Sequence, residues 1–202
     1  MRISDHRYNR DRLRFDLAVR MLHHGARART IRTWTGLSKD RQRKLFQVYL
    51  LQLPQPPERR MRSKLPHHAS CFLRSSTLGF EATTLASLFS ILGLICTEKA
   101  AEPSATWLNP LLRGEAFCQA YEIYRVLYPT ARLSFEHSLF LLESLARKDG
   151  VKLNTCGQCQ RLYLSDAVRI EQSGCGCGEQ RLPLPRRRRT LIRPPLHEER
   201  SL

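Results

Sequence analysis

Apolar residues recur at helical spacing along the first quarter of the chain. Leu13, Leu17, Met21 and Leu22 fall on one side of a helix, and Gly25 follows as a typical C-terminal cap. A shorter helix is predicted over 26–34. A third is predicted over 39–53, where Ser38 is a favourable N-cap and Pro54 ends the pattern. The first 53 residues are therefore expected to form a basic N-terminal arm followed by helix-turn-helix-like helices.

The second half of the chain repeats this helical pattern with more aromatic residues. Apolar helices are expected over 81–96 and 115–128, and Ser134 can cap another helix that Gly150 closes. Residues 54–80 are rich in proline and arginine near their start and are assigned as a connection. We therefore predict a mainly α fold, with a helical core and partner-binding region over 81–150.

Charge is unevenly distributed over these segments. The chain carries 34 Lys and Arg against 18 Asp and Glu, a formal net charge of +16. Residues 1–64 hold 17 basic and 5 acidic groups, whereas residues 65–150 hold 7 and 8. This distribution indicates that the ends face a polyanion while the middle packs or binds protein. The Arg run at 186–189 lies in a flexible tail over 183–202 and is either a non-specific phosphate arm or a solubilising segment.

The sequence contains no pattern typical of membrane insertion, export or catalysis. Its longest apolar run, 85–96, is too short for a bilayer, and the first twenty residues lack the apolar core of a signal peptide. We therefore expect a cytoplasmic protein. Neither HExxH spacing, a serine elbow nor a phosphate-binding glycine loop is present, so an enzyme is not expected.

Four cysteines form the most specific motif. Cys156 and Cys159 are separated by two residues, Cys175 follows after fifteen more, and one residue separates Cys175 from Cys177. Four close thiols predict one structural Zn²⁺ in a small module over 151–182, with no open position for catalysis. The alternatives are a thioredoxin-type redox pair, a disulfide framework, or partial or lost metal binding. No strand-then-helix pattern supports the redox pair, and no signal peptide supports the disulfides.

The second and third predicted helices match the outline of a helix-turn-helix, whose second helix enters the major groove of DNA. With Leu45 as the centre of the buried face, the residues within about 60° of it, and so on the buried side, are Arg41, Gln42, Val48, Tyr49 and Gln52. The side chains expected to face the groove lie opposite Leu45, and those expected to contact phosphates lie on the preceding helix. The first set is Lys39, Arg43, Lys44 and Gln47; the second is Arg27, Arg29 and Arg32. The alternative is a basic face that is merely solvated.

The order of these features resembles FlhC, the C subunit of the bacterial flagellar master transcription regulator. The matching residues are Gly25-Ala26-Arg27, Ile31, Gly36-Leu37-Ser38, Arg41, Leu45-Phe46, Leu65-Pro66 and the Cys156/Cys159 pair. The resemblance implies a mostly helical zinc protein that assembles with the D subunit, FlhD, into a heterohexamer. It further implies binding to promoters of flagellar genes and recruitment of RNA polymerase.

The chain departs from this family pattern at its metal motif and at both ends. The family has two Cys-x-x-Cys pairs, whereas here the second pair is Cys175-Gly176-Cys177. The basic arm over 2–14 and the Arg-rich tail have no counterpart in the family. Two other classes stay open: an RNA- or ribosome-associated zinc-binding protein, and a zinc-dependent thiol-redox or metal-handling protein.

Overall fold

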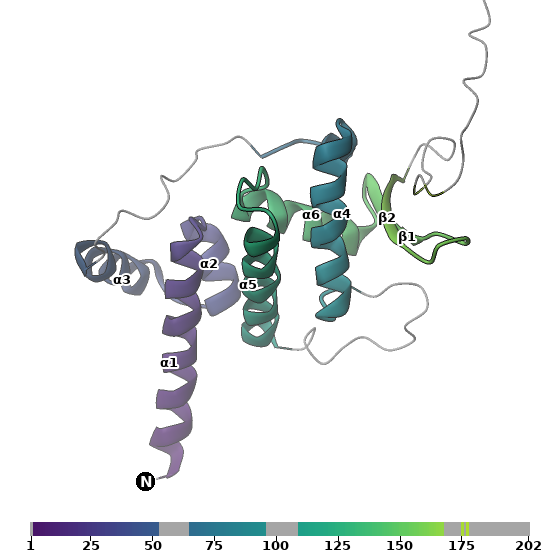
Figure 1. The fold of residues 1–202 in the computed structure, drawn as a ribbon. Helices are drawn as coiled ribbons and strands as arrows, with labels where there is room; N and C mark the ends of the chain where they lie inside the picture. The colour runs from purple at the N-terminus through teal and green to yellow at the C-terminus, as the bar shows by residue number, and fades with distance from the viewer. Residues whose placement is uncertain (1, 53–64, 96–108, 168–174, 176, 178–202) are drawn as a thin grey trace, which may run out of the picture.

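The computed structural model describes residues 2–52, 65–95, 109–167, 175 and 177, and it is mainly helical (Figure 1). The predicted boundary near residue 53 and the tail over 183–202 lie outside these residues, as does Cys96. The described elements are α1 (Arg2–His23), α2 (Ala28–Thr35), α3 (Lys39–Gln52), η1 (Ala69–Leu73), α4 (Ser76–Ile91), α5 (Pro110–Leu127), α6 (Phe135–Arg147), β1 (Val151–Thr155) and β2 (Leu162–Asp166).

The first three helices lie close to their predicted positions. Gly25 and Gly36 follow α1 and α2 with φ of 76° and 68°, values at which a side chain would be strained. The Gly36 N–H donates to Arg32 O at 2.9 Å and completes the last turn of α2. The segment 2–14, predicted as a basic arm, is the first part of α1 (Figure 1).

Several helix ends differ from prediction, including the end of α4, which is Ile91 and not residue 96, and the start of α5, which is Pro110 and not residue 115. The apolar helix expected from residue 81 begins at Ser76, because the Ser75 hydroxyl accepts the Leu78 N–H at 3.3 Å and caps it there. Ser134 caps α6 as predicted, accepting the His137 N–H at 3.3 Å. The left-handed residue that ends α6 is Lys148, with φ of 56°, and not Gly150.

Helix α5 lies at the centre of the fold, between α1 and α2 on one side and α4 on the other (Figure 1). Its Phe117 is fully buried and meets Phe135 of α6 edge to face, with ring centroids 4.9 Å apart. Gly114 allows α1 and α2 to approach α5 closely. A Cβ at this position would lie 2.6 Å from Leu17 Cδ2 and 3.0 Å from Trp34 Cε3.

A buried carboxylate connects α6 to the N-terminus of α2. Glu136 lies in the first turn of α6, where a negative charge complements the helix dipole. Its Oε1 accepts the Arg27 backbone N–H at 2.7 Å and the Thr30 hydroxyl at 2.9 Å. The buried carboxylate of Glu136 therefore accepts a hydrogen bond at the N-terminus of α2 and complements the dipole at the N-terminus of α6.

A second buried carboxylate anchors the turn that follows α5. Glu81 of α4 accepts the Tyr124 hydroxyl at 2.7 Å and the Arg132 N–H at 3.0 Å. The Tyr124 hydroxyl also accepts the Leu133 N–H at 3.2 Å. Burial, followed by the bond to Glu81, raises the pKa of Tyr124 above its ordinary value. The polar groups of this turn are therefore paired inside the fold.

An ionic network joins α1 to α5. Arg20 donates to both carboxylate oxygens of Glu122, at 2.7 and 2.6 Å, and also pairs with Glu115. His24 Nε2 lies 2.9 Å from Glu122 Oε1. The hydrogen bonds from Arg20 lower the pKa of Glu122 to about 2, with His24 contributing further.

Of the helices in the described ranges, none has the length and apolar character needed to cross a bilayer.

Candidate metal centre and basic surface

The cysteine motif is built on a β-hairpin that the sequence analysis did not predict. Strands β1 and β2 pair antiparallel, with Val151 opposite Asp166. In the connecting turn, the Cys156 N–H donates to Arg161 O at 2.9 Å and the Gln160 N–H donates to Cys156 O at 3.0 Å. Both bonds close the chain tightly around Cys156 and Cys159, so these two thiols share one turn.

All four predicted ligands come together at this turn. The Sγ atoms of Cys156, Cys159, Cys175 and Cys177 all lie within 4.8 Å of one another. Cys156 Sγ is 3.3 Å from Cys177 Sγ, and Cys159 Sγ is 3.4 Å from Cys175 Sγ. A tetrahedral zinc with Zn–S bonds of about 2.3 Å requires sulfur pairs about 3.8 Å apart. The cluster is somewhat smaller than one four-thiolate shell, and the Sγ atoms of Cys175 and Cys177, 2.7 Å apart, would have to separate by about 1 Å to bind the same ion.

The electrostatics of the cluster favour a bound cation. The backbone N–H of Cys159, followed by the Cys175 thiol and the Gln158 N–H, lowers the pKa of Cys156 to about 6. The bond with Cys175 raises the pKa of Cys177, since the crowded thiols resist a second negative charge. A divalent metal would remove this conflict by binding all four as thiolates. The four cysteines can therefore hold a metal ion, and a soft, all-sulfur donor set fits zinc.

The hairpin packs against α4, α6 and η1. Val151 and Leu164 are buried, and the Leu164 N–H donates to the Thr83 hydroxyl of α4 at 3.3 Å. Gly150, with φ of 75°, lets the chain enter β1 close beside Ala69 of η1. The cysteine turn lies at the other end of the hairpin, and Cys159 is exposed. The geometry fits a metal that holds the hairpin closed.

The other two described cysteines are separate from this centre. Cys118 is fully buried in α5, and burial raises the pKa of its thiol to about 12. Cys71 is half-buried, and burial raises its pKa as well. Both thiols stay protonated at neutral pH, as expected for small apolar side chains.

Five of the seven predicted nucleic-acid contacts line one depression between α2 and α3. Its volume is about 590 Å³, and its polar lining consists of Arg29, Arg32, Lys39, Gln42, Arg43 and Gln47, with Ala28 and Phe46 as apolar lining. The other two predicted contacts lie elsewhere. Lys44 is exposed outside the depression. Arg27 lies beside Glu136, with Nε 3.9 Å from its carboxylate. The sequence separated these residues into two functional sets, whereas the fold places most of them around one feature.

The buried face of α3 differs from the one predicted. Gln42 is buried and its amide donates to Leu37 O at 3.2 Å, while Leu45, Phe46 and Tyr49 are half-buried. Val48, predicted on the buried side, is 56% exposed. The centre of the buried face is therefore rotated by about 50° from Leu45 at 100° per residue. This rotation turns Lys39 and Arg43 towards α2.

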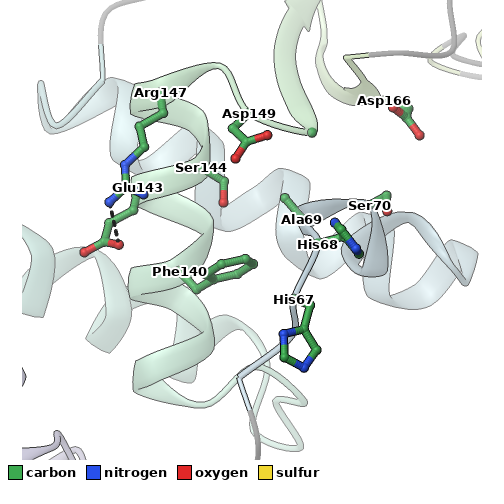
Figure 2. A pocket seen from close by; sticks show the side chains of 11 residues that line it. His67, His68, Ala69, Ser70, Phe140, Glu143, Ser144, Arg147, Asp149 and Asp166 are labelled. Atoms are coloured by element: carbon green, nitrogen blue, oxygen red, sulfur yellow. Dashed lines mark hydrogen bonds and ion pairs between the residues drawn. The ribbon is translucent and has the colours of Figure 1, made fainter.

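A further depression, of about 340 Å³, lies between η1, the end of α6 and the start of β1 (Figure 2). It is lined by His67, His68, Asp149 and Asp166, which no sequence signal marked as a site. Figure 2 shows these side chains spread around the rim, with Arg147 turned to Glu143 at 3.3 Å. Within the described ranges, only the four cysteines bring three or more candidate ligand atoms together. We assign no function to this depression.

Comparison with known proteins adds no identification. No protein-family model matches the chain, and no curated protein sequence matches it.

Proposed function

We propose that this chain is the DNA-binding subunit of a transcription activator similar to FlhC. In this proposal α2 and α3 act as a helix-turn-helix-like unit, and the protein is cytoplasmic and not an enzyme. The observation that carries the proposal is the convergence of Arg29, Arg32, Lys39 and Arg43 on one depression. Asp40 forms an ion pair with Arg43, in which Asp40 Oδ1 and Arg43 Nη1 are 3.9 Å apart. Both side chains are exposed, so this pair contributes little free energy and does not neutralise the set. A polyanion is therefore the partner that this surface favours.

The proposed metal is a single structural Zn²⁺ held by Cys156, Cys159, Cys175 and Cys177. When bound, it supplies a cross-link and no chemistry, since four thiolates complete its shell. The cysteines lie at the far end of the hairpin from Gly150, and the hairpin in turn covers part of α4. Loss of zinc would therefore disturb this end of the molecule first and the basic surface last.

The partner subunit in this proposal is an FlhD-type protein, with which the chain assembles before it recruits RNA polymerase at promoters of motility genes. The support for a protein partner is the number of exposed apolar side chains on α4 and α5. They are Phe80, Ile91, Leu112, Ile123, Val126 and Leu127. Exposed apolar side chains on two packed helices are typical of a protein–protein interface.

Selection from a random duplex DNA pool with the zinc-loaded full chain tests the proposal. We expect enrichment of particular sequences, with binding that weakens steeply as salt rises. The matched control replaces both Arg29 and Arg43 with Ala and should lose most of the affinity. Equal binding to all duplexes, together with tighter binding to a structured RNA of the same length, would contradict the proposal. That result would support the RNA- or ribosome-associated alternative, which the same cations favour.

A further inference from the structure

We infer that the depression between α2 and α3 is a clamp for the phosphodiester backbone and not a surface that reads base edges. The clamp consists of Arg29 and Arg32 from α2 with Lys39 and Arg43 from α3. The inference rests on the proposed nucleic-acid function and deepens it, because it reassigns Lys39 and Arg43 from bases to phosphates.

The shape of the site supports this assignment. Base edges lie at the floor of a groove about 8.5 Å deep, so the side chains that read them must protrude from the protein. The four cations are exposed, and they line a hollow of about 590 Å³ between two helices. Phosphate groups form the outermost ridge of a nucleic acid, and a ridge fits a hollow.

The chemistry of the lining supports it as well. Every charged residue that lines the hollow is basic, and three of the four are arginines, whose planar guanidinium binds phosphate oxygens in pairs. Among the described residues, Arg29, Arg32 and Lys39 have no carboxylate within ion-pair distance. The described part of the fold therefore leaves these three charges available to an anion.

The position of the hollow adds a further contribution. Lys39, Gln42 and Arg43 belong to the first two turns of α3, a helix of 14 residues. The positive end of the helix dipole lies there and favours an anion. Lys44 lies outside the hollow on the same helix and provides a matched comparison for charge without clamp geometry.

The test compares two duplexes, a sequence enriched by selection and its scrambled version, at several salt concentrations. Each single change to alanine at Arg29, Arg32, Lys39 or Arg43 should weaken both duplexes by the same factor and lower the salt slope by about one. Arg43→Lys should retain most of the slope, and Lys44→Ala should leave it unchanged. Circular dichroism and melting curves establish that each variant is folded.

Several outcomes would overturn the clamp. One is a changed affinity ratio between the two duplexes in Arg43→Ala, because it would show base reading. Another is a salt slope that stays at the wild-type value in all four variants while the wild type binds. That result would exclude the clamp but would not contradict the proposed function. If the wild type binds neither duplex nor RNA, the proposed function fails together with the clamp. Inorganic phosphate at constant ionic strength should not displace the duplex; displacement at micromolar phosphate would show a small-anion site instead.

Discussion

Two regions of the molecule are stabilised in different ways. One is the helical body, formed by α1, α2, α4, α5 and α6. The other is the cysteine hairpin, which consists of residues 151–167 with Cys175 and Cys177. The body buries aromatic and leucine side chains around Phe117 and pairs its buried carboxylates with N–H and O–H donors. The hairpin has two strands of five residues and buries little beyond Val151, Leu164 and Ser165. An isolated two-stranded hairpin is marginally stable in water. Burial stabilises the body, whereas the hairpin, which buries little and packs on α4 and α6, would gain stability from a metal bound at its cysteine turn.

The largest effect that separates the two regions is expected from Cys156→Ser. The variant should lose stoichiometric metal and become protease-sensitive over 151–177, because structural zinc contributes about 10–16 kcal/mol to the folding of such modules. The helical circular dichroism should persist, since the body does not depend on the metal. Metal analysis and limited proteolysis measure both regions, with Cys71→Ser as the control. Full metal retention in Cys156→Ser would show that this thiol is not a ligand.

Phe117→Ala tests the body. Removing this fully buried ring should cost about 3–5 kcal/mol, from lost burial and the cavity left behind. The control is Val126→Ala on the same helix, where the side chain is 79% exposed and the change should stay within about 0.5 kcal/mol. Denaturant unfolding gives both values. A Phe117→Ala variant of unchanged stability would mean that burial around α5 does not hold the body.

Gly114→Ala tests the close packing of the body around α5 by adding a single methyl group. The new Cβ would lie 2.6 Å from Leu17 Cδ2 and 3.0 Å from Trp34 Cε3, so these side chains, packed between α5 and the helices α1 and α2, must move. Overpacking of this kind costs about 1–3 kcal/mol. Thermal melting measures the change, and Gly157→Ala, where nothing lies within 4 Å of the new Cβ, is the control. Equal melting temperatures for the two variants would contradict close packing at Gly114.

Glu122 should make the stability of the body dependent on pH. Its folded pKa of about 2 lies below the ordinary value of 4.5, so its contribution is present above pH 4.5 and is lost as pH falls towards 2. The side chain is 38% exposed, so we expect about 1 kcal/mol after solvent screening. Glu122→Gln should flatten the stability profile in this window. An unchanged acid profile in the variant would show that Arg20 does not stabilise the charged carboxylate.

The smallest expected effect is that of Arg41→Ala. Arg41 was predicted to pack along the core, but it is exposed and lies 3.7 Å from Asp11. Exposed ion pairs of this kind contribute about 0.2–1 kcal/mol. The melting temperature should therefore change little. A loss above this range would support the original prediction of a buried stem.

Periodicity predicted the helices well where apolar and polar residues alternate clearly. It placed α3 and the cap at Ser134 correctly, because Ser38, Pro54 and Ser134 are strong local signals. It failed at the start of α4, since the residues from 76 to 79 are small or neutral and carry no amphipathic pattern. On α3, Gln42 and Tyr49 were placed correctly on the buried side, but Arg41 and Val48 are exposed, because the buried face is centred near Gln42, which bonds to Leu37 O, and not at Leu45.

The metal centre was predictable and its scaffold was not. Residue type and spacing were enough to select the four cysteines, and the structure brings the Sγ atoms of all four predicted ligands together. The two strands are too short for alternation to distinguish them from a loop. Glu81 and Glu136 were also missed, since a sequence does not show which carboxylates will be buried and paired across more than 40 residues.

The hydrogen bonds of Glu136 have a mechanical consequence for any regulator built on this fold. The carboxylate joins the start of α2 to the start of α6, 109 residues apart in the chain between Arg27 and Glu136. A force applied to the start of α2 would reach α6 through this carboxylate as well as through the packing of α2 on α1 and α5. The basic side chains that α2 carries are thereby held at a fixed orientation to the helical body, by a buried carboxylate together with apolar packing.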